Sequence, residues 1–290
     1  MRITRPGLRA TVQDRGRSGG ARDGIPPSGP ADPHAFAAAL RLVGCASDDA
    51  AIEAVGLPFA FRCDDRRIVT ATGRDVHIRT RGGRVPGWTS VLVRPGEEVV
   101  VEGSDRTRYA YIAVSGGLAL GSVLGSRATY LPAALGPLPR PLVAGDELPL
   151  GASGAGMEAA GKRSAPSTYG ASVRAIAGPH DGRFPAGSLE RFFGSAFTVL
   201  PESDRMGVRL AGPAIGPADG ELLTCGIVAG AIQVPRGGAP ILLLADHQTT
   251  GGYPIVATVI EADLGIAAQA APGETLRFER VTPEDAARSV

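Results

Sequence analysis

The chain has 290 residues, of which 43% are hydrophobic and 20% are charged, and its formal net charge is +1. This length accommodates one large domain or two of ordinary size. The near balance of acidic and basic residues is not typical of a nucleic-acid-binding protein. No apolar run at the start resembles a signal peptide, and the longest apolar stretches are too short to cross a bilayer. We therefore expect a soluble, cytoplasmic protein with neither a membrane nor a nucleic acid as partner.

Cysteine usage points to the same compartment. The three cysteines, Cys45, Cys63 and Cys225, are odd in number and far apart, and no C-x-x-C pattern occurs. Reduced thiols are expected rather than disulfides. The four histidines are scattered, and none is paired with other ligands at metal-binding spacing. No metal site is therefore predicted.

Short apolar runs separated by glycine and proline dominate the chain, which contains 41 Gly and 24 Pro. Several runs are rich in β-branched or aromatic residues and alternate roughly with polar ones, which is typical of strands. This pattern predicts a mainly β protein. The clearest predicted strands are residues 67–72, 90–94, 98–102, 109–114, 241–245 and 255–260.

Helices are expected to be few and short. Asp32 can cap a helix, and Pro33 suits a first helical turn. The run 34–43 then places apolar side chains on one face. Residues 189–193 and 283–288 are predicted to form two further short helical segments.

The chain is expected to divide into two β domains, at residues 1–150 and 168–290. The stretch between them, residues 151–167, is small and polar in composition and is predicted to be a linker or mobile loop. The two halves also resemble each other locally. Arg94-Pro-Gly-Glu and Ala271-Pro-Gly-Glu both resemble a turn that leads into a strand, which fits two related domains.

Two short patterns are misleading. Residues 156–163 nearly match a phosphate-binding P-loop, but Arg163 stands where Ser or Thr must follow the lysine, and no strand precedes the loop. Residues 16–20 match G-x-S-x-G, but the glycine- and proline-rich sequence that follows cannot begin the helix that a nucleophile elbow requires. We therefore predict a linker at the first segment and a turn at the second.

Three loops combine polar side chains with glycine: residues 13–19, 203–210 and 246–254, with Gln233 just upstream of the last. Glutamine, threonine and backbone amides can recognise an amide or ureido group, and Arg and Asp can orient a carboxylate or carbonyl. Asp246 or His247 could accept a proton. An equally good interpretation is structural, with an ion pair between Asp204 and Arg209 and a tight turn at the paired glycines.

These loops carry a resemblance to a known family. Q-D-x-G-R-x-G from residue 13, S-D-R-M-G-x-R-L at 203–210, G-A-I-Q-V-P at 230–235 and T-T-G-G-Y-P at 249–254 resemble motifs of the biotin-dependent carboxyltransferase-like family. That family includes allophanate hydrolase subunit 2 and the C-type subunit of 5-oxoprolinase. The resemblance extends from about residue 3 to 279 and implies two cyclophilin-like β-barrel domains with a few short helices.

The resemblance implies a component of an ATP-dependent 5-oxoprolinase, which hydrolyses 5-oxo-L-proline to L-glutamate. It implies two partners, a homologous B-type subunit similar to allophanate hydrolase subunit 1 and a third, A-type protein. It also implies ATP, with magnesium, at an unknown site. The implied catalytic residues are Asp246 and His247. The implied substrate-binding residues are Gln13, Asp14, Arg17, Arg205, Gln233, Gln248, Thr249, Thr250 and Tyr253.

Two alternatives remain open. Other relatives move a carboxyl group from carboxybiotin to urea, and the chain could be such a carboxyltransferase component, with biotin on a separate carrier. The single lysine, Lys162, does not lie in a biotin-attachment sequence. Still other relatives are regulatory partners that antagonise a kinase inhibitor, so a non-catalytic binding role is the third hypothesis.

Overall fold

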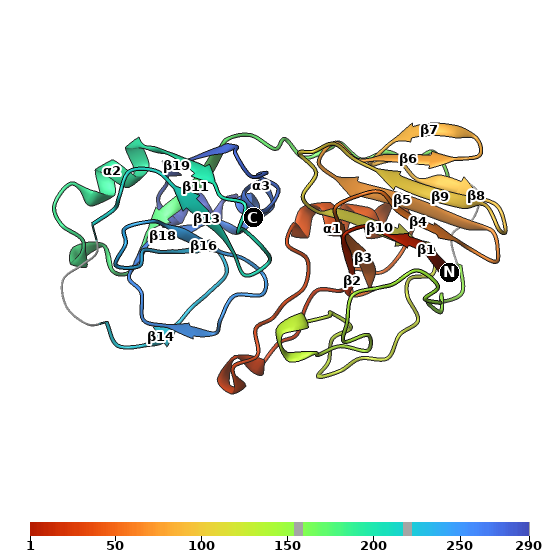
Figure 1. Ribbon diagram of the computed structural model, residues 1–290, viewed down its shortest axis with the longest axis horizontal. Helices are drawn as coiled ribbons and strands as arrows, with labels where there is room; N and C mark the ends of the chain where they lie inside the picture. Colours follow the sequence, from red (N-terminus) through yellow and green to blue (C-terminus); the bar gives the residue numbers. More distant parts are fainter. Residues whose placement is uncertain (154–158, 217–221, 290) are drawn as a thin grey trace. The chain divides into compact units, whose positions relative to one another are not determined.

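A computed structural model describes residues 1–153, 159–216 and 222–289 (Figure 1). The chain divides into two compact units. Unit 1 comprises residues 1–18 and 28–168, and unit 2 comprises residues 19–27 and 169–290. The assignment of residues 19–27 to unit 2 was not predicted. No helix among the described residues is long and apolar enough to span a membrane.

Unit 1 consists of two five-stranded antiparallel sheets around one apolar core (Figure 1). Strands of both sheets point Val, Ile, Phe and Ala side chains into this core, which is how alternating strands bury one face. In sheet order, the first sheet is β1 (Arg2–Pro6), β4 (Phe59–Arg62), β9 (Glu98–Glu102), β6 (His77–Thr80) and β7 (Gly83–Pro86); the second is β2 (Arg9–Gln13), β3 (Ala51–Val55), β10 (Ala110–Val114), β5 (Arg67–Gly73) and β8 (Val91–Val93).

One helix, α1 (Pro33–Leu42), covers the second sheet of unit 1. The Asp32 carboxylate accepts a hydrogen bond from Ala35 N, as a capping residue should, and Pro33 occupies the first turn. Phe36 packs edge-on against Tyr111 of β10. The predicted helix is therefore confirmed, and its apolar face is buried on the sheet.

Unit 2 is a closed barrel. Aromatic side chains pack helix α2 (Ser188–Gly194) against the barrel, where the ring of Phe192 stacks on Phe278 at a centroid distance of 4.8 Å and packs beside Phe197. The mainly β prediction is confirmed, as are the short helices. The barrel order is β11 (Ser172–Ala177), β18 (Ile255–Val259), β15 (Ala231–Gln233), β16 (Ile241–Leu243), β13 (Gly207–Ala211), β12 (Ala196–Val199) and β19 (Thr275–Arg280); the helices are α2 (Ser188–Gly194), α3 (Leu264–Ala268) and α4 (Pro283–Ala287).

A small two-stranded ribbon lies outside the barrel sheet of unit 2. It consists of β14 (Cys225–Gly226) and β17 (Thr250–Gly251), with Cys225 opposite Gly251. In sequence, β17 lies between the barrel strands β16 and β18. The glycine-rich loop that connects these two strands therefore forms one half of the ribbon.

The Pro-Gly-Glu echo has the same structure in both units. Gly96 and Gly273 adopt positive φ values of 72° and 86°, which glycine reaches without strain. The glutamate after each glycine accepts a hydrogen bond from the backbone N–H three residues earlier, at 3.0 Å for Glu97 and 2.9 Å for Glu274. Each turn then feeds a strand, β9 or β19, as predicted.

Much of the predicted linker is held against unit 1. Residues 154–158 lie outside the described part of the chain, and with them the start of the P-loop-like pattern. Beyond them, Ser90 N donates to Lys162 O at 2.9 Å, and Gly161 N donates to Ser90 O at 2.8 Å. Ala159 is buried. Backbone hydrogen bonds to Ser90, just before β8, hold this segment. Such bonds do not depend on side chains, so the sequence shows no strong apolar pattern here.

Candidate active site

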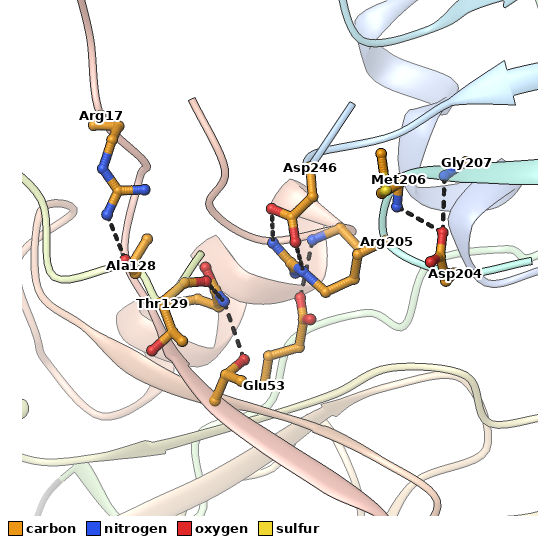
Figure 2. A network of polar contacts seen from close by, with 12 residues as sticks. Arg17, Glu53, Ala128, Thr129, Asp204, Arg205, Met206, Gly207 and Asp246 are labelled. Atoms are coloured by element: carbon orange, nitrogen blue, oxygen red, sulfur yellow. Dashed lines mark hydrogen bonds and ion pairs between the residues drawn. The ribbon is translucent and has the colours of Figure 1, made fainter. Parts of the chain in front are cut away.

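A buried ion pair lies in the barrel of unit 2, just before the start of β13 and just after the end of β16. Arg205 precedes β13, and Asp246 follows β16. Arg205 Nε and Nη2 donate to the two Asp246 carboxylate oxygens at 2.7 and 2.9 Å (Figure 2). Asp246 N also donates to Arg205 O at 2.9 Å, and each residue is 4% exposed. This bidentate pair fixes the start of the 246–254 loop, which gives both residues a positioning role.

The turn before β13 delivers Arg205 to this pair. Asp204 Oδ1 accepts hydrogen bonds from Met206 N at 2.9 Å and Gly207 N at 3.3 Å (Figure 2). Asp204 therefore closes a turn rather than serving as the ion-pair partner of Arg209. The structural interpretation of this loop was right about a local role for Asp204 but named the wrong partner.

His247 follows the ion pair and is 3% exposed. Its Nδ1 lies 2.6 Å from the carbonyl oxygen of Gln248. Because a carbonyl can only accept, Nδ1 carries the proton, and in the neutral ring Nε2 carries the lone pair. Nε2 makes no hydrogen bond within the described residues. Of the two predicted catalytic residues, His247 therefore has a basic atom to offer, whereas the Asp246 carboxylate is engaged by Arg205.

Two glutamine side chains meet beside this loop. Gln233 is the last residue of β15 and is 2% exposed, and its Oε1 accepts a hydrogen bond from Gln248 Nε2 at 3.1 Å. Gln233 Nε2 is buried and has no hydrogen-bond partner within the described residues. Most buried polar atoms are paired, so an unpaired amide donor in a strand needs an explanation. A bound acceptor such as a substrate carbonyl would provide one.

The remaining predicted residues of unit 2 lie on or near the β14–β17 ribbon. Thr249 O accepts a hydrogen bond from Ile227 N at 3.0 Å, and Thr250 pairs with Gly226. The Thr250 side chain is exposed, and Tyr253 is 49% exposed. The predicted set thus divides into a buried group at the strand ends and an exposed group on the ribbon.

Three of the predicted residues, Gln13, Asp14 and Arg17, lie in unit 1 and form hydrogen bonds within it. Asp14 accepts hydrogen bonds from Gly16 N, Ser126 Oγ and Arg127 N. Arg17 Nη2 donates to the carbonyl of Ala128 (Figure 2). These contacts tie the 13–17 turn to residues 126–128, so this geometry gives Asp14 a structural task instead of a free carboxylate.

Gln13, the last residue of β2, is the third of these residues. Its Nε2 donates to Thr11 Oγ1 at 3.0 Å and to Thr129 O at 3.1 Å, and Gln13 is fully buried. Oε1 has no hydrogen-bond partner within the described residues.

Sequence reasoning missed Glu53 of β3. Its Oε2 accepts hydrogen bonds from Ala31 N at 3.0 Å and Tyr111 Oη at 2.9 Å, and the residue is 2% exposed. The available signal was a charged residue within the otherwise apolar run 51–55. Glu53 holds the segment that leads into α1.

No set of metal-binding side chains is evident in residues 1–153, 159–216 and 222–289. No group of three His, Cys, Asp or Glu side chains in these ranges is arranged to hold an ion.

The family model described as "Carboxyltransferase domain, subdomain A and B" matches residues 23–280. The protein belongs to this family, as the sequence motifs predicted.

Three curated relatives show which members of this family the chain resembles. The chain is 34% identical to the C-type subunit of 5-oxoprolinase from Escherichia coli (strain K12), covering 100% of this chain and 94% of the relative. It is 35% identical to the same component of 5-oxoprolinase from Haemophilus influenzae, with 97% and 91% covered. It is also 29% identical to urea amidolyase of Saccharomyces cerevisiae, where the match covers 96% of this chain and 16% of that protein.

Solved structures agree with this assignment. The protein TTHA0988 superposes with a TM-score of 0.86 at 30% identity, over 96% of this chain and 54% of that chain. The chain therefore spans about half of TTHA0988. Urea amidolyase of K. lactis superposes with a TM-score of 0.89 at 27% identity, over 99% of this chain and 19% of that chain.

Proposed function

We propose that this protein is the C-type subunit of an ATP-dependent 5-oxoprolinase, which opens 5-oxo-L-proline to L-glutamate. Two curated relatives of nearly equal length are named as this component of 5-oxoprolinase. Within the chain, the observation that carries the proposal is the unpaired, buried Nε2 of Gln233. It is a donor suited to the carbonyl of a small amide.

The reaction breaks the ring C–N bond of the lactam. A water oxygen adds to the ring carbonyl carbon, the nitrogen leaves with a proton, and the products are the amino group and the new carboxylate of glutamate. We assign His247 Nε2 as the base that removes the water proton, and Gln233 Nε2 as a donor to the carbonyl oxygen as negative charge develops there. Gln248 orients the Gln233 amide through their hydrogen bond.

The Arg205–Asp246 pair acts as support in this scheme. Its two hydrogen bonds and its burial fix the loop that carries His247 and Gln248. Thr249, Thr250 and Tyr253 remain candidates for contacts to the rest of the substrate, including its carboxylate. We assign Gln13 and Arg17 no step, because the hydrogen bonds described for them hold backbone carbonyls within unit 1.

When bound, ATP would supply the driving force for opening a stable lactam through its hydrolysis to ADP and phosphate. The described residues of the P-loop-like segment do not fit a nucleotide phosphate, because the Gly161 N–H, a donor that a phosphate would need, is already bound to Ser90 O. We therefore place the nucleotide chemistry in the assembled complex rather than at this segment. A B-type subunit and an A-type protein are the proposed partners.

Carboxyl transfer to urea or a similar amide is the second candidate. The similarity to urea amidolyases favours it. The amide site described above would suit urea as well as a lactam, since both present a planar carbonyl. This reaction needs carboxybiotin on a separate carrier, which is the requirement that distinguishes the two candidates.

The test is glutamate release by this chain co-expressed with its genomic neighbours, measured with and without ATP. ATP-dependent glutamate formation that disappears when this chain is omitted supports the proposal. A well-folded, fully assembled complex that releases no glutamate contradicts it. Carboxylation of urea when carboxybiotin carrier is added would then support the second candidate, and inactivity in both assays would support a regulatory role.

A further inference from the structure

A surface cavity in unit 1 lies between the turn that joins β6 to β7 and the turn that leads into β9 (Figure 1). Its volume is about 470 Å³, which is within the range of small-ligand sites. Charged residues dominate its lining, which includes Arg79, Arg81, Arg94, Glu97 and Glu98. The amide site uses none of these residues, so the cavity needs an account of its own.

Glu97 holds the two turns together. Its Oε1 accepts a hydrogen bond from Arg81 N at 2.9 Å, and its Oε2 accepts one from Arg94 N at 3.0 Å. Because one carboxylate binds both backbone groups, Arg81 and Arg94 are held close together at the lining of the same cavity. Glu97 therefore positions two arginines that are 13 residues apart in the sequence.

The guanidinium groups of Arg81 and Arg94 have no hydrogen-bond or ion-pair partner within the described part of the chain. Of the other glutamates on β9, Glu98 and Glu102 each pair with a different arginine, at 3.3 and 2.9 Å. Two positive charges thus lie at one cavity without a carboxylate bound to either. A bound anion would offset their mutual repulsion and accept their hydrogen bonds.

We propose that this cavity binds an anion that carries a phosphate group, through Arg81 and Arg94. A single carboxylate is planar and is satisfied by one arginine that binds it bidentately. A tetrahedral phosphate presents oxygens in several directions, so it can accept hydrogen bonds from both guanidinium groups at once. Inorganic phosphate and the phosphate groups of a nucleotide share this chemistry. The inference is independent of the proposed function, because it involves no residue of the amide site.

The test is a titration of the ¹⁵N-labelled full chain with inorganic phosphate and, separately, with ADP. It is followed through the backbone amide signals of Gly82 and Gly96, which lie in the two turns. Both signals should shift saturably with ligand. ADP binding at least as tightly as phosphate would identify a nucleotide as the source of the phosphate group, and weaker binding of ADP would identify free phosphate. No saturable shift with either ligand overturns the inference.

Variants separate a specific site from a general attraction to positive charge. Arg81→Met and Arg94→Met should each weaken phosphate binding about tenfold, because each removes charge-assisted hydrogen bonds to the anion. Arg84→Met is the matched control, since Arg84 lies on β7 outside the lining of the cavity and its loss removes the same charge. All three arginines are exposed, so no substitution removes core packing.

The control should change the affinity by less than about twofold, because an exposed charge that does not touch the anion is screened. Equal weakening in all three variants would show that only the net charge matters and would overturn the inference. Acetate, a single carboxylate, should bind more weakly than phosphate. Acetate binding as tight as that of phosphate would overturn the assignment of a phosphate group.

Discussion

Each unit of the protein buries a glutamine at the end of a strand, but the two are anchored differently. In unit 1, Gln13 donates to Thr11 and Thr129, and the adjoining turn is tied down by the Asp14 carboxylate. In unit 2, Gln233 bonds to one partner, the half-buried side chain of Gln248, and its own donor is left over. The first arrangement uses both donor hydrogens to brace a loop and leaves the Gln13 acceptor Oε1 over, whereas the second leaves the Gln233 donor Nε2 over, which suits the carbonyl of an amide ligand. Similar residue types at similar positions thus serve different purposes.

The largest expected effect comes from breaking the ion pair that supports the unit 2 site. Arg205→Met should lower the free energy of unfolding by about 3–5 kcal/mol, because the buried Asp246 carboxylate loses both charge-assisted hydrogen bonds from Arg205. Urea unfolding measures this. Arg140→Met is the matched control in unit 1, since Arg140 forms a similar bidentate pair with Asp146 but is half exposed. Equal losses in the two variants would contradict the account.

The second effect concerns catalysis. His247→Asn retains a donor for the Gln248 carbonyl but removes Nε2. kcat for glutamate formation should fall by about 10²–10⁴, which is typical for the loss of a general base, while KM changes little. His34→Asn, at an exposed position in unit 1, should leave kcat unchanged. Wild-type kcat in His247→Asn would remove His247 from the proposed mechanism.

A smaller effect is expected when the hydrogen bonds that Asp14 accepts in unit 1 are weakened. Asp14→Asn replaces one carboxylate oxygen with a donor, so one of the three groups that Asp14 binds loses its acceptor. The expected loss is about 1–3 kcal/mol of unfolding free energy. Asp105→Asn, at an exposed site, provides the control. If Asp14→Asn were as stable as that control, the structural role of Asp14 would be wrong.

The smallest effect is a pH dependence in unit 2. His180 Nδ1 accepts a hydrogen bond from Ile255 N at 3.1 Å, which requires an unprotonated Nδ1. Burial, and then the nearby Arg183 charge, lower the pKa of His180. The unfolded chain therefore binds the proton more readily, so this contribution is complete above about pH 6.5 and is lost as the pH falls through the lowered folded-state value.

His180→Gln tests this linkage, since a glutamine can still accept the hydrogen bond but does not titrate. Between pH 7.5 and 5.5 the wild type should lose slightly more stability than the variant, and the difference is small because the ring is partly exposed. Identical pH profiles would exclude His180 as the source.

Local chemistry made much of the fold predictable. Asp32-Pro33 identified the start of α1, and the two Pro-Gly-Glu turns identified the starts of β9 and β19, because each depends on neighbouring residues alone. The pairing of residues 159–164 with the chain around Ser90 was not predictable, since it rests on backbone hydrogen bonds between distant segments.

The sequence could predict which polar loops form the site, but it could not predict which of their residues support the site and which are available to a ligand. Sequence motifs drew attention to Arg205, Asp246 and Gln233. They could not show that the first two satisfy each other while the third keeps a free donor, since this depends on three-dimensional contacts.

The most direct test of the central claim is nuclear magnetic resonance of the side-chain amides. The ¹⁵N-labelled chain, alone and with its unlabelled partners, is titrated with 5-oxoproline, and the Gln233 amide signals are assigned by substitution. The account predicts that the Gln233 side-chain NH₂ resonances shift saturably with ligand. Gln233 resonances that stay unchanged at saturating 5-oxoproline would contradict the assignment of the amide site to unit 2.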